Sequence, residues 1–254
     1  MKLLTPLILS ALPTLALSTT LPTRILAGIT VPDTPTITRA LAFASANMDT
    51  HTYNHVLRSW LVGQATISHL PPNSTTGPID LEAFAISAIL HDLGWSPNPA
   101  LISPDKRFEV DGANVAREFL RREGDEGAWP EARLQLVWDA IALHTSRDIA
   151  LYKQPEVWLT SLGILAELVG PSVAVPLFGP DRVAVTQEEW DEISRVYPRT
   201  GLRQFFRDVM IGICTSKPAT TYNNFMADYG ERYVEGFSEE GKRTIDFLEK
   251  NMKE

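Results

Sequence analysis

The sequence predicts an all-α protein that forms a single domain of about ten helices. Apolar residues recur at helical spacing along most of the chain, alternating apolar and polar residues typical of strands are scarce, and Pro or Gly separates the periodic segments. The chain has 254 residues and 44% hydrophobic content, which suits one large domain or two small ones with a sizeable core. We expect one domain over residues 19–254.

The first three predicted helices cover residues 34–48, 52–70 and 81–93. Residues 34–48 and 52–70 each carry an apolar face, and Pro71 and Pro72 end the second helix. Residues 81–93 are almost continuously hydrophobic until Gly94, which predicts a central, buried helix.

Further helices are predicted on the C-terminal side of Pro104. They start or end at Pro and Gly residues and repeat the helical apolar spacing, over residues 105–122, 131–143, 155–168, 187–197, 201–214, 223–234 and 239–250. Residues 171–185 contain three prolines and no clear period. We interpret this stretch as a loop or insertion that could cover a site.

The N-terminus has the pattern of a secretory signal peptide over residues 1–18. Lys2 precedes an uncharged apolar run, and Ala16 and Ser18 offer small residues at a cleavage site. The run is shorter than the ~20 residues of a membrane span, so we expect no stable membrane anchor after its removal. Asn73-Ser74-Thr75 is an N-glycosylation sequon. These features predict a secreted protein, or one in the secretory pathway, that is glycosylated at Asn73.

The charge of the chain argues against nucleic-acid binding, and its cysteine content excludes an intrachain disulfide. The net charge is −8 and the pI about 5.2, and there is no cluster of Lys and Arg of the kind that binds nucleic acid. The single cysteine, Cys214, lies in an apolar run, which predicts a buried thiol and no intrachain disulfide. Nothing in the sequence indicates an oligomeric state.

His91-Asp92 follows the buried helix and is the first candidate for chemistry. Such a polar pair is costly to bury unless its groups are paired or bind a metal. An imidazole and a carboxylate together suit Zn²⁺, Fe²⁺ or Mn²⁺. The alternative is an ordinary helix terminus with a histidine near the negative end of the helix dipole.

His55 lies upstream in a predicted helix and is the second candidate. His51 is one turn before it on the same face, and we expect His51 to face water. Arg58 either pairs with a carboxylate near the site or carries an ordinary surface charge.

Five segments in this order resemble the HD superfamily of metal-dependent hydrolases, and more closely its fungal cyanamide hydratase-like branch. They lie within residues 54–171 and read NHVLRS (54–59), ILHDLG (89–94), KRFEVDGA (106–113), AIALHT (140–145) and GILAELVGP (163–171). The resemblance implies an all-helical HD fold and one divalent metal held by His55, His91, Asp92 and a fourth carboxylate. The family usually has Asp at the fourth position, where this chain has Glu167. Glutamate is one methylene longer, so it either binds the metal, weakens its binding or misses it.

The resemblance also implies roles for other residues. His144 matches an additional histidine of the family's site and would orient water or substrate, or shuttle a proton. The alternative is a core histidine bonded to backbone. Glu109 and Asp111 do not share a helix face, so at most one points into the site, and both also fit an acidic first helical turn. We therefore consider Asp92, His144 and Glu109 as catalytic residues, and Arg58 and Asp111 as substrate-binding residues.

The expected reaction is attack of a metal-activated water on a small molecule. A divalent metal lowers the pKa of its water from 15.7 toward about 7. Zn²⁺ is the first choice, with Fe²⁺ and Mn²⁺ as alternatives. The resemblance implies a nitrile-like substrate and a cyanamide hydratase-like hydro-lyase. Two alternatives stay open at this point: a metal-dependent phosphohydrolase, and a non-catalytic secreted protein with a degraded metal site.

Overall fold

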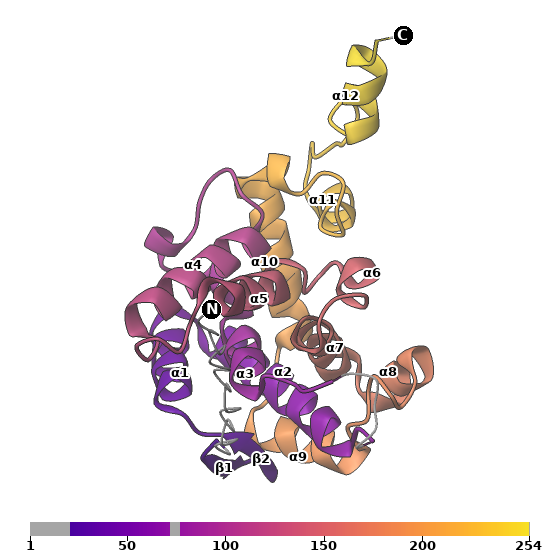
Figure 1. The fold of residues 1–254 in the computed structure, drawn as a ribbon. Helices are drawn as coiled ribbons and strands as arrows, with labels where there is room; N and C mark the ends of the chain where they lie inside the picture. The colour runs from indigo at the N-terminus through magenta and orange to yellow at the C-terminus, as the bar shows by residue number, and fades with distance from the viewer. Residues whose placement is uncertain (1–20, 72–76, 254) are drawn as a thin grey trace, which may run out of the picture.

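The computed structural model describes residues 21–71 and 77–253, and its body is a bundle of packed helices (Figure 1). The all-α prediction is therefore confirmed. The predicted signal peptide over residues 1–18 and the predicted glycosylation site Asn73 lie outside the described residues. Among the described helices, none combines the length and the apolar character that crossing a membrane would require.

The described chain begins with a two-stranded antiparallel hairpin that the sequence analysis missed. It consists of β1 (Thr23–Leu26) and β2 (Ile29–Pro32). Ala27 and Gly28 both have positive φ, 45° and 80°, as a tight two-residue turn between twisted strands requires. Each strand has only four residues, too few for a clear alternating pattern.

Twelve α-helices follow in the described part of the chain. Three 3₁₀ segments, His91–Trp95, Pro99–Leu101 and Pro218–Thr220, lie between them. The helices are α1 (Pro35–Asn47), α2 (Thr50–His69), α3 (Leu81–Leu90), α4 (Phe108–Glu123), α5 (Glu131–Ala142), α6 (Arg147–Ala150), α7 (Pro155–Val169), α8 (Pro171–Phe178), α9 (Gln187–Val196), α10 (Leu202–Ser216), α11 (Ala227–Tyr233) and α12 (Thr244–Asn251).

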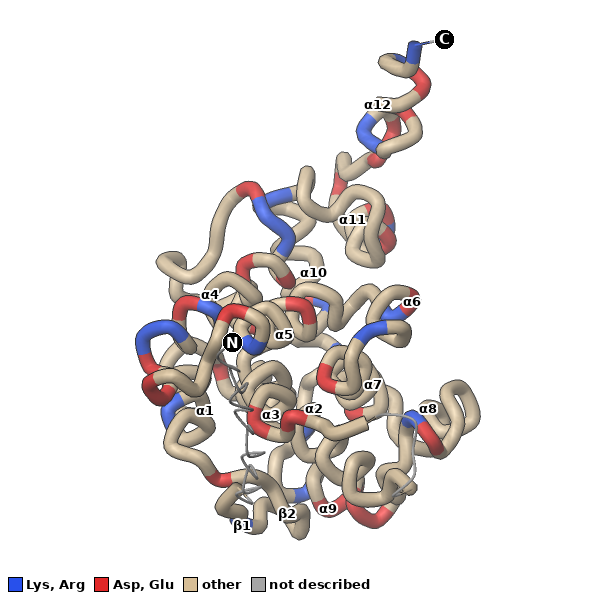
Figure 2. The backbone as a smooth tube through the Cα atoms, in the orientation of Figure 1, with Lys and Arg blue, Asp and Glu red and all other residues tan. Residues whose placement is uncertain are grey.

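Helix α3 is the central helix of the bundle, as its composition predicts. Its residues from Glu82 to Leu90 are all buried, and it contacts α1, α2, α5 and α7. Helix α12 extends away from the body (Figure 1). Lys and Arg are interspersed with Asp and Glu along the surface elements (Figure 2). Cys214 is buried, as expected.

Two expectations about local structure are wrong. Residues 171–185 were expected to form a loop, but Pro171–Phe178 forms helix α8. Pro171 stands at the first helical position, where its missing N–H costs nothing. Helix α4 starts at Phe108 rather than near residue 105, because residues 103–107 instead fold against Asp111, whose carboxylate accepts from the Ser103 backbone N–H at 3.0 Å.

Close backbone approach at two glycines fixes the positions of α2, α7 and the His91–Trp95 segment, which carry the candidate site residues. A Cβ added to Gly163 of α7 would lie 3.0 Å from the backbone oxygen of Ser59 and 3.3 Å from Cα of Gly63, both in α2. A Cβ added to Gly94 would lie 1.7 Å from the backbone oxygen of Phe108. Only glycine lets α7 approach α2, and the His91–Trp95 segment approach α4, this closely.

An ion-pair network at the start of α3 anchors this helix to α5. Asp80 caps α3 by accepting from the backbone N–H of Ala83 at 3.0 Å, and it accepts from Arg133 Nε at 2.6 Å. Arg133 also donates to Glu82 at 2.8 Å. Burial would raise the pKa of Asp80, but the hydrogen bonds and charge of Arg133, with the capping bond, outweigh it and lower the pKa.

Asp80→Asn should therefore destabilise the protein in a pH-dependent way. Asparagine keeps the cap but loses the charge, so we expect the free energy of unfolding at pH 7 to fall by about 1 kcal/mol. Because the folded pKa of Asp80 lies below its unfolded value, the stabilisation is complete above the unfolded pKa. It disappears as the pH falls through the folded pKa. Urea titrations at pH 7 and pH 3 measure the difference, with the exposed Asp181→Asn as control. An equal loss at both pH values would contradict this account.

Candidate metal centre

His91 and Asp92 lie where α3 gives way to the 3₁₀ turn His91–Trp95. The side chains of both residues are buried. The Nδ1–H of His91 donates to the carbonyl of Ala88 at 2.9 Å, which leaves Nε2 with a free lone pair. This Nε2 lies 3.0 Å from Oδ2 of Asp92. The helix end thus turns both side chains toward the same point.

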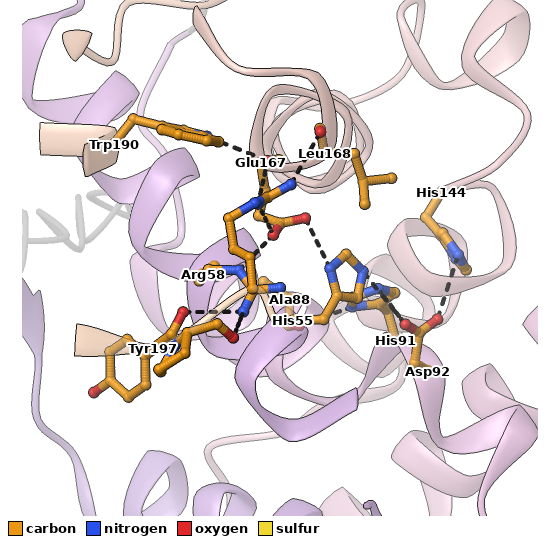
Figure 3. Close-up of polar contacts among 12 residues, drawn as sticks. His55, Arg58, Ala88, His91, Asp92, His144, Glu167, Leu168, Trp190 and Tyr197 are labelled. Atoms are coloured by element: carbon orange, nitrogen blue, oxygen red, sulfur yellow. Dashed lines mark hydrogen bonds and ion pairs between the residues drawn. The ribbon is translucent and has the colours of Figure 1, made fainter. Parts of the chain in front are cut away.

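His55 reaches this point from α2. Its Nε2 lies 3.5 Å from Oδ2 of Asp92, and its Nδ1 lies 2.9 Å from Oε2 of Glu167 (Figure 3). A carboxylate next to Nδ1 assigns the proton to this nitrogen, so Nε2 again carries the lone pair. His55, His91 and Asp92 each offer one ligand atom within 4.8 Å of the others.

The facing atoms have no hydrogen-bond partner of their own. Nε2 of His55, Nε2 of His91 and both carboxylate oxygens of Asp92 are buried and unsatisfied. Leaving such groups unpaired costs free energy, roughly 1–3 kcal/mol for each neutral group and more for a charged one. A divalent cation among them would satisfy all three side chains, and two imidazoles with one carboxylate suit Zn²⁺, Fe²⁺ or Mn²⁺. The donor set therefore fits a metal ion.

Glu167 occupies a different place from the one expected of a fourth ligand. It lies on α7 outside the three-residue cluster, and its carboxylate is already engaged on both oxygens. Oε2 accepts from His55, and Oε1 accepts from Arg58 Nε at 2.5 Å (Figure 3). Oε1 also accepts from Arg199 Nη1. Burial would raise the pKa of Glu167, but His55 and the two arginines outweigh it and lower the pKa to about 2.

Arg58 pairs with a carboxylate near the site, as one of its two expected alternatives had it, and the structure does not place it in the cavity as a substrate-binding residue. Its side chain is 1% exposed. Besides Glu167, it donates to the carbonyls of Tyr197 and Pro198 at 3.1 and 2.9 Å. Its guanidinium is thus used within the structure and does not line the cavity described next. Arg199, the other partner of Glu167, was not singled out from the sequence because it lies in a short connection between two helices.

A cavity of about 200 Å³ opens beside the three ligand residues. Its walls are mainly apolar and aromatic and come from both halves of the chain. They are formed by His55, His91, Asp92, Trp95, Phe108, His144, Thr145, Arg147, Ile164, Leu165, Leu168, Phe206, Met210, Phe225 and Tyr229.

His144 lines this cavity from the end of α5. Its Nδ1–H donates to the carbonyl of Ile141 at 2.7 Å, so Nε2 is the free nitrogen. This Nε2 lies 3.9 Å from Oδ1 of Asp92. Burial, together with neighbouring His91, lowers the pKa of His144 to about 4, against the opposing charges of Asp92 and Glu109. The structure therefore places a neutral imidazole beside the three candidate ligand residues at neutral pH.

Glu109 and Asp111 lie behind the cavity wall. Glu109 accepts from Arg107 and from the hydroxyl of Thr145, both at 2.5 Å. Burial would raise its pKa, but the hydrogen bond and charge of Arg107 lower it. Asp111 accepts from Lys217 Nζ at 2.9 Å. Neither carboxylate lines the cavity, so the structure does not place Glu109 as a group that touches substrate, nor Asp111 as a substrate-binding residue.

The sequence analysis missed the aromatic walls of the cavity. Phe206 and Met210 come from α10, and Phe225 and Tyr229 from the segment around the start of α11, all outside the motif region 54–171. Residues 171–185, expected to cover a site, contribute nothing to the lining. The apolar face of the predicted helix over residues 201–214 was the available signal, but it does not distinguish a cavity wall from core.

The comparison with protein families agrees with this geometry. No curated protein matches the chain. Residues 52–168, which contain His55, His91, Asp92, His144 and Glu167, match the family model of the HD domain. This match, together with the cluster of two histidines and an aspartate, supports placing this segment in the HD superfamily, whose members are typically metal-dependent hydrolases.

Proposed function

We propose that the protein is a metal-dependent hydratase or hydrolase that adds water to a small, neutral, nitrile-like molecule. The observation that carries this proposal is the convergence of unsatisfied, buried ligand atoms from His55, His91 and Asp92 on one point beside a cavity. When bound there, a divalent metal supplies Lewis acidity and lowers the pKa of a water molecule.

The chain's own residues would position the reactants and move protons. The mainly apolar walls lower the local polarity, which strengthens electrostatic interactions inside the cavity. His144 presents a free Nε2 at the edge of the cavity, near Asp92. In the proposed reaction this nitrogen takes up a proton from the attacking water and returns it to the developing anion of the substrate.

The size and lining of the cavity support a small neutral substrate. A volume of about 200 Å³ with mostly apolar walls accommodates a molecule of a few heavy atoms. Arg147 is the only Lys or Arg in this lining, whereas a phosphate dianion is typically bound by several converging cations. Arg147 has no ion pair among the described residues, and this observation keeps phosphate-ester hydrolysis as the second candidate.

A degraded, non-catalytic site is less well supported by this geometry. The presence of Glu167 in place of the family's Asp was the main argument for such a protein. However, Glu167 orients a ligand histidine, and the three remaining ligand residues suffice for a metal with open positions. The secretory location, with a signal peptide over residues 1–18 and glycosylation at Asn73, remains part of the proposal.

Metal analysis tests the proposed function directly. We expect the purified protein to contain about one Zn²⁺, Fe²⁺ or Mn²⁺ per chain, because three protein ligands suffice for a catalytic site. His91→Ala should lose the metal, whereas His69→Ala, a change of an exposed histidine, should keep it. Inductively coupled plasma mass spectrometry gives the content. A panel of nitriles, isonitriles and phosphomonoesters then identifies the reaction. Wild-type protein with negligible metal after incubation with each ion, and with no turnover, would overturn the proposal.

His144→Gln should separate catalysis from metal binding. Glutamine cannot exchange the proton, so we expect turnover to fall by roughly 100-fold or more. Metal content should stay at the wild-type level, because His144 is not one of the three clustered ligands. Steady-state kinetics on the best substrate of the panel, with metal analysis of the same samples, measures both. Wild-type turnover in this variant would remove His144 from the mechanism.

Glu167→Gln tests the positioning role of Glu167. We propose that this carboxylate fixes the ring of His55 for metal binding, and loss of such an orienting partner typically weakens metal affinity by about 10–100-fold. Competition with a chromogenic chelator measures the Kd for Zn²⁺. Glu189→Gln is the matched control, because Glu189 pairs with His69 at 2.9 Å on the surface. Circular dichroism checks that both variants fold. Equal Zn²⁺ affinity in the two folded variants would contradict the positioning role.

A further inference from the structure

A second hollow, with a volume of about 270 Å³, lies between α10 and α11 and is lined by three arginines. Arg203 and Arg207 are one turn apart on α10 and therefore share a face. Arg232 faces them from α11. Asp228, Tyr229 and Tyr233 complete the lining. We call this feature the arginine hollow.

The charges of the three arginines are not neutralised by ion pairs with other described residues. In the described part of the chain, none of them forms an ion pair, although Asp228 lines the same hollow and the whole protein carries a net charge of −8. Other surface arginines do pair: Arg121 with Glu131 at 3.2 Å and Arg195 with Glu192 at 2.6 Å. Like charges held together without a partner repel each other, so the hollow is suited to a bound anion.

Arg207 lies against an aromatic ring of the hollow. Its guanidinium lies over the ring of Tyr233, 5.1 Å from the ring centroid. A cation–π contact of this kind attracts the guanidinium to the ring, and no hydrogen bond or ion pair to another described residue is made by its N–H groups. Guanidinium groups bind carboxylates and phosphates with paired, parallel hydrogen bonds.

The arginine hollow adjoins the cavity beside the metal ligands, because Tyr229 lines both. We propose that the arginine hollow binds the carboxylate or phosphate group of a small ligand at the edge of the metal cavity. The observations that carry this proposal are the unpaired guanidinium groups and their shared hollow. It therefore stands independently of the proposed reaction.

Calorimetric titration of the purified full chain with inorganic phosphate, and separately with malonate, tests the proposal at low ionic strength. We expect saturable binding of at least one probe, with a Kd on the order of millimolar. The double variant Arg203→Gln/Arg232→Gln should weaken it at least ~10-fold, because charge-assisted hydrogen bonds are lost. Arg121→Gln/Arg195→Gln removes the same charge elsewhere on the surface and should leave the affinity unchanged. The relative affinity for phosphate and malonate distinguishes the two acidic groups.

His91→Ala separates this site from the metal centre. If the arginine hollow holds the anion, the His91→Ala variant binds the probe as wild type does. If the wild-type protein lacks metal but binds the probe in a way that depends on Arg203 and Arg232, the proposed reaction is overturned and the proposed anion site is supported. Three results would overturn the proposed anion site: no saturable binding of either probe, an equal loss of affinity in the two double variants, or probe binding abolished by His91→Ala alone. Arg207→Lys should also weaken binding of the probe, since lysine keeps the charge but cannot make the paired hydrogen bonds.

Discussion

The close crossing of α2 and α7 is the constraint on which the polar centre depends. Gly163 lets the two backbones approach, and this approach brings the carboxylate of Glu167 within 2.9 Å of His55. The carboxylate then determines which nitrogen of His55 carries the proton and which one faces Asp92. A larger residue at Gly163 would meet backbone atoms of α2, so the whole helix pair would have to separate. The orientation of His55 thus depends on Gly163, a residue without a side chain.

The charge of Glu167 is balanced locally. His55, Arg58 and Arg199 surround one fully buried carboxylate. Arg199 also donates to the carbonyls of Glu167 and Leu168 near the end of α7, where the helix dipole favours a cation. The same arginine therefore stabilises the carboxylate and the helix terminus that carries it.

Most of the fold was predictable from the sequence, because the helical apolar period is long and strong in most elements. The hairpin β1–β2 and helix α6 were missed, since four residues are too few to show a period. The expected pairing of His55 with His91-Asp92 was available from the order of motifs. The position of Glu167 could not be predicted from the order of motifs, because it depends on Arg199, a residue 32 positions away that donates to it. The contributions of α10 and α11 to the cavity could not be predicted from the sequence either, since an apolar helix face has the same residue pattern whether it packs in the core or lines a cavity.

The division of the cavity between two parts of the chain has a consequence for how this protein could change. The candidate metal ligands lie within residues 52–168, whereas much of the apolar wall comes from later segments. Substitutions at Phe206, Met210 or Phe225 would reshape the enclosed space without moving an imidazole or carboxylate ligand. Related proteins with the same candidate metal ligands can therefore differ in the substrates that fit the cavity, through substitutions in the C-terminal segments alone.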